Sequence, residues 1–166
     1  MLNRFEKLVE SMTLRTAQAA QVAMVFIMVV IVANVILRIP WKPLGGTVEL
    51  VEMAGAILLA LGVAYTAMLK GHIMVGILVE KFPPRIRRLT DIIVNLIALV
   101  FSFILARELL FYALNMLSRG YETGHLKIPV APSIFLVAFG FIMLCMVLLL
   151  NVLRAAQSLA KGGKEG

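Results

Sequence analysis

The sequence predicts an all-α, polytopic membrane protein with four transmembrane helices, an N-terminal interfacial amphipathic helix and both termini in the cytoplasm. Composition points first to a membrane. Of the 166 residues, 61% are hydrophobic, and the mean hydropathy is +0.99, whereas a soluble domain is typically about half apolar. A chain of this length leaves much of its surface in contact with solvent. Part of that solvent must therefore be lipid.

Four long apolar runs set the predicted architecture, because a helix needs roughly 20 mainly apolar residues to cross a bilayer. The runs are continuously apolar, unlike barrel strands, which alternate apolar and polar residues over about 10 positions. Arg107 and Glu108 interrupt the third run, but its helical pattern continues to Leu117. The predicted spans, within a single domain of residues 1–166, are 16–38, 47–69, 89–117 and 130–153.

The first 15 residues are predicted to form a helix on the inner membrane surface, with the chain turning into the membrane at Arg15. Apolar residues recur there at intervals of three and four, with polar and charged residues between them, which is the pattern of an amphipathic helix. A cleaved signal peptide fits less well, since the apolar run exceeds the usual length of about 7 to 15 residues and lacks a small-x-small site. Residues 154–166 are interpreted as a cytoplasmic tail.

The distribution of basic residues predicts the orientation, because Lys and Arg accumulate on the cytoplasmic side of membrane proteins. The N-terminal flank, the loop between spans two and three and the C-terminal flank hold eleven of the sixteen Lys and Arg residues. The opposite flanks hold four, and Arg107 lies within the third run. Both termini are therefore expected on the cytoplasmic side. The charge is divided among flanks and forms no single stripe, so no nucleic-acid partner is expected.

Four charged side chains in or near the spans are candidate partner contacts, since an ionisable group inside a membrane usually marks a function or a partner. Glu49 and Glu52 could instead stabilise the N-terminus of the second span. Arg107 lies roughly 28 Å along a helix from Arg88 and is expected near the outer boundary of the hydrocarbon. There it either snorkels to the interface or belongs to a docking surface. Glu108 is expected to point elsewhere and not to pair with Arg107.

Small residues recur every four positions in the second span, at Ala56, Ala60 and Ala64. Such a face lets two helices approach closely in lipid. It could pack inside the four-helix unit or against a partner. The single cysteine, Cys145, allows no internal disulfide or thiolate metal site and is interpreted as an apolar filler.

The motifs of enzymes and ion carriers are absent from the sequence. It contains no HExxH, GxSxG or Gly-rich phosphate loop, and His72 and His125 flank opposite sides of the membrane. No acidic residue is expected in the middle of spans one, three or four, where a carrier of ions alone usually places ionisable groups. These observations predict a non-catalytic membrane scaffold without a cofactor.

Two other functions, a small exporter and an intramembrane enzyme, fit the sequence less well. A small self-sufficient exporter, working as a homodimer, usually needs an embedded acid in its first helix, where this chain has only Gln18, Gln21 and Asn34. An intramembrane enzyme needs a nucleophile and a base at one depth, and Ser102 and Ser133 have no suitable histidine nearby.

Several stretches occur in an order typical of one transporter family. They are NVILRI at the end of span one, VELVE at the start of span two, KGHI followed by FPPRIRR, and LKIPVAPSIF at the start of span four. In this order the sequence resembles the small, Q-type (DctQ-like) membrane subunit of tripartite ATP-independent periplasmic (TRAP) transporters. The resemblance covers nearly the whole chain.

The resemblance implies a location in the bacterial inner membrane and two protein partners. One is a large TRAP membrane subunit that moves an organic anion, a carboxylate or sulfonate, with a sodium gradient. The other is a periplasmic substrate-binding protein that docks transiently. The small subunit would scaffold the first and help to dock the second, with membrane lipids around it. Arg38 and His72 lie within the matching stretches and complete the candidate interface residues.

Overall fold

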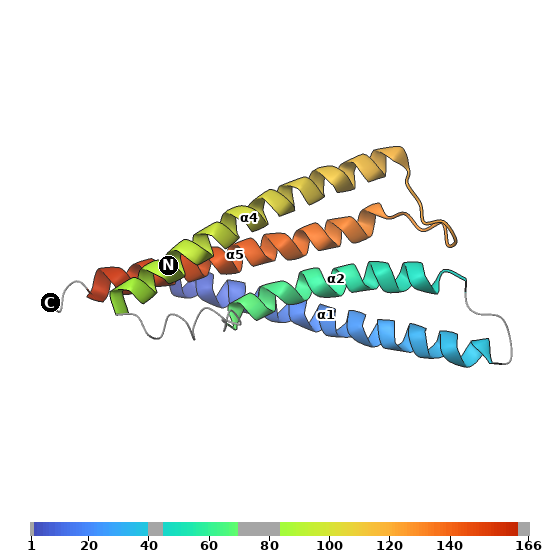
Figure 1. Cartoon of the computed structure of the whole chain (residues 1–166), viewed down its shortest axis with the longest axis horizontal. Coiled ribbons are helices and arrows are strands. Elements are labelled where there is room, and N and C mark those ends of the chain that lie inside the picture. The colour runs from blue at the N-terminus through green and yellow to red at the C-terminus, as the bar shows by residue number, and fades with distance from the viewer. Residues whose placement is uncertain (1, 40–44, 70–83, 163–166) are drawn as a thin grey trace.

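The computed structural model describes residues 2–39, 45–69 and 84–162. Its regular structure is helical, as predicted, and each of the four helices contains a stretch long and apolar enough to cross a membrane. The helices in Figure 1 are α1 (Leu2–Arg38), α2 (Thr47–Met68), α4 (Pro84–Arg119) and α5 (Ala131–Gly162).

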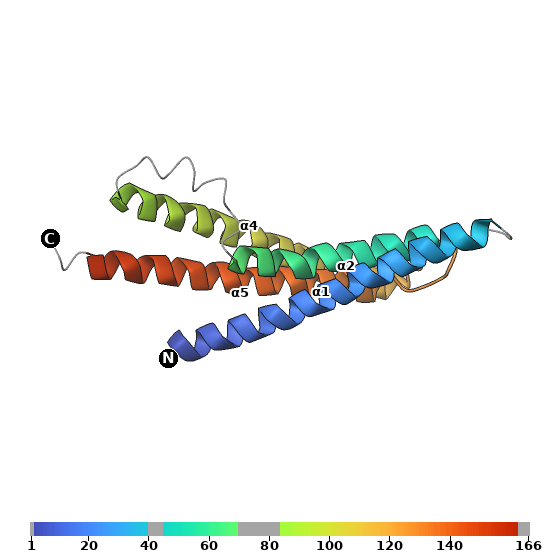
Figure 2. The ribbon, with the colours of Figure 1, turned by 90° about the horizontal axis from the view of Figure 1, so that it is seen from below.

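The helices lie side by side in a row, in the order α4, α5, α2, α1 (Figure 1). Among the described residues, α5 packs on α4 and on α2, whereas α1 packs mainly on α2 and more lightly on α5. The start of α1 and the end of α5 lie at one end of the row, here called the termini end (Figure 1). The opposite end, where α1 ends, α2 begins and residues 120–130 join α4 to α5, is the loop end. At the termini end, α1 and α4 diverge to opposite sides of α5 (Figure 2).

A glycine lets α5 lie directly on α2. A Cβ atom at Gly140 would collide with the backbone carbonyl of Ala60. Ala60 and Ala64 are almost completely buried, so two of the three small residues predicted to form a packing face pack inside the chain, whereas Ala56 is exposed. The apolar core continues from this contact toward the termini end. It is built from Val9 of α1, Ala64 and Ala67 of α2, and Met143, Leu144, Val147, Leu148 and Leu150 of α5.

The first helix runs without a break through the position where a turn was predicted. α1 contains neither proline nor glycine, so nothing in its backbone chemistry ends the helix at Arg15. Its first part is also held by packing, since Val9 and Thr13 are buried and the Thr13 hydroxyl donates to the Val9 carbonyl at 2.7 Å. The predicted turn at Arg15 was therefore wrong.

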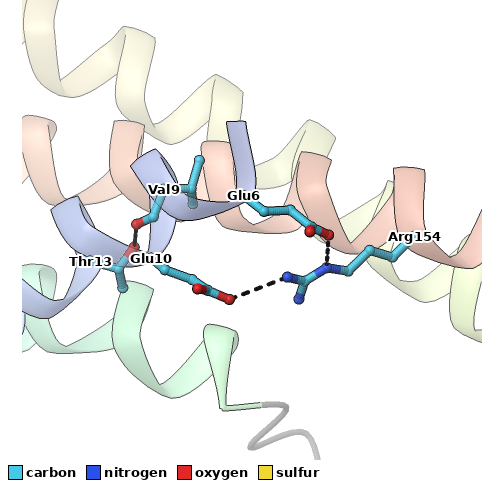
Figure 3. Close-up of polar contacts among 5 residues, drawn as sticks. All are labelled: Glu6, Val9, Glu10, Thr13 and Arg154. Atoms are coloured by element: carbon cyan, nitrogen blue, oxygen red, sulfur yellow. Dashed lines mark hydrogen bonds and ion pairs between the residues drawn. The ribbon is translucent and has the colours of Figure 1, made fainter. Parts of the chain in front are cut away.

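Two ion pairs join the start of α1 to the end of α5 (Figure 3). The Arg154 Nε donates to the Glu6 carboxylate at 2.7 Å, and a terminal nitrogen of the same guanidinium lies 3.4 Å from the Glu10 carboxylate. Glu6 and Glu10 are four residues apart and so share one face of α1. Arg154 is the first charged residue of α5, and it fixes the position of the α1 N-terminal turns against that helix.

The remaining helix ends differ from the predicted spans in length. α4 begins at Pro84, five residues before the predicted span, because proline is well suited to the first turn of a helix. It ends at Arg119, and the φ of 61° at the following Gly120 allows the two hydrogen bonds that close a Schellman motif. α5 continues to Gly162, so much of the predicted tail is helical.

Replacing Gly140 by alanine should loosen the α2–α5 contact. The added methyl group meets backbone, which cannot rotate away, and overpacking of this kind costs about 1 to 3 kcal/mol. The midpoint of thermal denaturation of the purified chain in detergent should fall. Gly62→Ala is the matched control, since a Cβ there meets nothing within 4 Å. Equal denaturation midpoints for the two variants would contradict the proposed contact.

Exchanging the charges of the α1–α5 ion pair should restore part of the stability that each single charge reversal removes. Glu6→Arg and Arg154→Glu should each destabilise the chain, and the double variant should recover part of the loss. Because both side chains are partly exposed, the coupling free energy should be modest, about 0.5 to 1 kcal/mol. Denaturation of all four proteins measures it, and additive effects would show that Glu6 and Arg154 do not interact.

Candidate partner-binding surface

The loop that joins α4 to α5 is closed by its own hydrogen bonds. The Thr123 N–H donates to the Ile128 carbonyl at 3.0 Å, and the Val130 N–H donates to the Tyr121 carbonyl at 3.2 Å. The Ile128 N–H also donates to the Thr123 hydroxyl at 3.1 Å. These bonds give residues 121–130 a defined conformation at the loop end of the row.

Glu49 fastens this loop to α2. Its two carboxylate oxygens accept hydrogen bonds from the backbone N–H groups of His125, at 2.7 Å, and Leu126, at 3.1 Å. The Leu126 side chain covers Gly46, where any Cβ would collide with it and where φ is 82°. Glu49 lies in the first turn of α2, as predicted, and its carboxylate is in addition bound by the loop, which the sequence did not predict.

The other candidate residues differ in their exposure. Glu52 lies on α2 and forms no ion pair with any residue in the described ranges. Arg38 is the exposed last residue of α1. His72 falls outside the described residues, as does the KGHI stretch that contains it. Ala56 is exposed on α2, whereas Ala60 and Ala64 are covered by α5 and cannot reach a partner chain.

Arg107 and Glu108 do contact each other, contrary to the prediction from their adjacent positions. The Arg107 guanidinium lies 3.4 Å from the Glu108 carboxylate, and both side chains are 62% exposed. Two long side chains can bend toward each other even when their Cα–Cβ bonds point apart. The guanidinium also lies over the Phe111 ring, 5.1 Å from its centre, which is a favourable cation–π distance.

This ion pair lies near the middle of the apolar stretch of α4. That stretch runs from Ile92 to Arg119, and Arg107 lies about 18 Å along the helix from Arg119. The prediction from the sequence instead counted from Arg88 and placed Arg107 near the outer boundary of the hydrocarbon. Glu108 also lies near the middle of this stretch, whereas no acidic residue was expected in the middle of span three.

An apolar groove of about 860 Å³ runs between α4 and α5 beside this pair. Arg107 is the one charged residue among those that line it. Cys145 contributes to the wall, in agreement with its interpretation as an apolar filler. The sequence held no signal for the groove, because its apolar residues are those expected of any membrane helix. The largest apolar lining side chains are Leu99, Phe103, Leu110, Phe111, Ile142 and Met146.

The family model described as the DctQ component of tripartite ATP-independent periplasmic transporters matches residues 27–158. The chain belongs to this family. It is therefore a multi-pass membrane protein and the small permease component of a TRAP transporter. No curated protein and no solved structure matches it significantly. The matched range includes the anchored loop, the groove and the ion pair, and it begins after the α1 residues that contact Arg154.

Replacing Glu49 by alanine should release the 120–130 loop from α2, because the N–H groups of His125 and Leu126 then lose the carboxylate to which they donate. With Cys145 replaced by alanine and a cysteine introduced at the exposed Lys127, maleimide labelling should become faster in the Glu49→Ala background. Glu52→Ala is the control, since Glu52 carries a similar charge three residues away without holding the loop. Equal labelling rates in the two backgrounds would show that Glu49 does not anchor it.

Proposed function

We propose that this chain is a non-catalytic scaffold for a large, sodium-coupled TRAP subunit and that it helps to dock the periplasmic substrate-binding protein. The family match carries the proposal, since it covers α2 and α4 completely, α5 as far as residue 158 and the last third of α1. The transported substrate would be an organic anion, a carboxylate or a sulfonate, bound by the partners.

The proposed location is the bacterial inner membrane, with both termini in the cytoplasm. The two described chain ends lie at the same end of the helix row (Figure 1). The flanks assigned to that side hold eleven of the sixteen basic residues, and such an excess favours the cytoplasmic side. The loop end would then face the periplasm.

The loop end is the proposed docking surface for the binding protein. Its 120–130 loop is hydrogen-bonded internally and fixed to α2 through Glu49. A surface that is ordered before binding loses less conformational entropy when a partner arrives. The exposed Arg38, Glu52 and Lys127 give this end charges of both signs for transient contact.

The scaffold role is supported by the open row of helices. A row presents two long edges to the membrane, formed by α1 and α4, and most of their apolar side chains are exposed. A partner can cover such an edge over the full depth of the bilayer. The large subunit could therefore move its other parts while one part stays fixed to this chain.

Purification of the tagged chain from its native membrane in mild detergent should recover one large polytopic membrane protein in stoichiometric amount, identified by mass spectrometry. A tagged, unrelated four-span protein from the same membrane is the control for non-specific capture. Recovery of the chain alone would contradict the proposed function. Recovery of a self-assembled dimer, with cation transport by the reconstituted chain, would favour the homodimeric exporter.

A further inference from the structure

We infer that the groove between α4 and α5, together with Arg107 and Glu108, receives a transmembrane helix of the large subunit. This helix should carry a carboxylate or amide side chain at the depth of Arg107 and bulky apolar side chains that enter the groove. The inference rests on the proposed function, and it names the surface and the chemistry of the partner.

The position of the Arg107–Glu108 ion pair is unfavourable for a surface that faces lipid. Arg107 and Glu108 lie midway along the apolar span of α4, and each side chain is 62% exposed. Charged groups within membranes almost always face a protein interior or a water-filled cavity. The contact at 3.4 Å engages one nitrogen of a guanidinium that carries five N–H donors. Within residues 2–39, 45–69 and 84–162 the guanidinium has no other hydrogen-bond acceptor, so a partner can supply acceptors for the remaining donors.

A bound phospholipid does not supply those acceptors. Its phosphate lies at the membrane surface, about 15 Å from the centre of a hydrocarbon layer of roughly 30 Å. An extended arginine side chain does not cover that distance, and here the guanidinium is held beside Phe111 and Glu108. Acyl chains could fill the groove but would leave the charged groups without hydrogen-bond partners. A protein helix can fill the groove with apolar side chains and also provide polar partners for Arg107 and Glu108.

The opposite edge of the row offers a comparison within the same chain. The apolar stretch of α1 is also widely exposed, but it holds no charged residue between Arg15 and Arg38. That surface suits lipid as it stands. Charge complementarity therefore selects the α4 edge, with its groove of about 860 Å³, as the edge that a polar transmembrane helix covers.

Photocrosslinking from two neighbouring phenylalanines tests the surface. Phe103 lines the groove and is 64% exposed, whereas Phe101 is 62% exposed and lies outside the groove lining. Each is replaced in turn by p-benzoylphenylalanine in native membranes, and Phe26, exposed on α1, serves as a third site. Phe103 should give a protein adduct with the large subunit, and Phe101 and Phe26 should give little or none.

Each other outcome overturns the inference in a recognisable way. A large-subunit adduct from Phe26 or Phe101 alone would leave the proposed function intact and move the interface elsewhere. An adduct at twice the 18.2 kDa mass of the chain would identify a second copy as the occupant. Lipid adducts alone from Phe103, with the large subunit still recovered by purification, would assign the groove to lipid. If neither the purification nor the photocrosslinking recovers the large subunit, the proposed function is contradicted as well.

Replacing Arg107 and Glu108 by leucines distinguishes a surface that binds a partner helix from one that faces lipid, because the two cases predict different recovery of the large subunit. If a partner helix binds here, Arg107→Leu/Glu108→Leu should lower recovery of the large subunit about tenfold or more, because truncated ion pairs leave the opposing group buried and unpaired. The yield and thermal stability of the isolated chain should stay the same or rise. Unchanged recovery of the large subunit would show that the pair faces lipid. Lys7→Leu/Arg15→Leu, which removes two exposed charges from α1, is the control.

Discussion

The close contact between Gly140 and Ala60 connects the two halves of the molecule. α1 and α2 form one pair of helices and α4 and α5 form the other, and the pairs meet chiefly where α5 lies on α2. In lipid, apolar side chains gain little by leaving the solvent, so helices associate through close packing. At this contact a glycine, which lets the two backbones approach closely, therefore stabilises the helix pair more than a large apolar side chain would. The anchored loop and the α1–α5 ion pairs join the same two halves at the two ends of the row.

The arrangement as a row gives the chain two free edges with different chemistry. A closed bundle of four helices would bury its charged residues inside, but here Arg107 and Glu108 remain on the outside, in the middle of the apolar span. Charged groups within membranes almost always face protein or a water-filled cavity. This edge is therefore the one that we propose contacts the large subunit.

Acidic residues serve different purposes at the two ends of the row. At the loop end Glu49 accepts two backbone N–H groups and holds a connecting loop to α2. At the termini end Glu6 and Glu10 hold the guanidinium of Arg154 (Figure 3). Both sets of contacts bring together residues more than 70 positions apart. They fix the relative height of helices that apolar packing alone would leave free to slide.

The sequence by itself determined the four helices, because run length and continuous apolarity are local properties that a bilayer requires of any spanning segment. It also determined the family, through short stretches that lie in the right order. The tertiary structure decided which small residues are internal, where Glu49 binds and where Arg107 lies along the groove between α4 and α5. A helix can slide or rotate along its neighbour without any change in its own hydropathy. The height and facing of each helix relative to its neighbours were therefore settled by contacts such as Gly140 with Ala60, which no single apolar run contains.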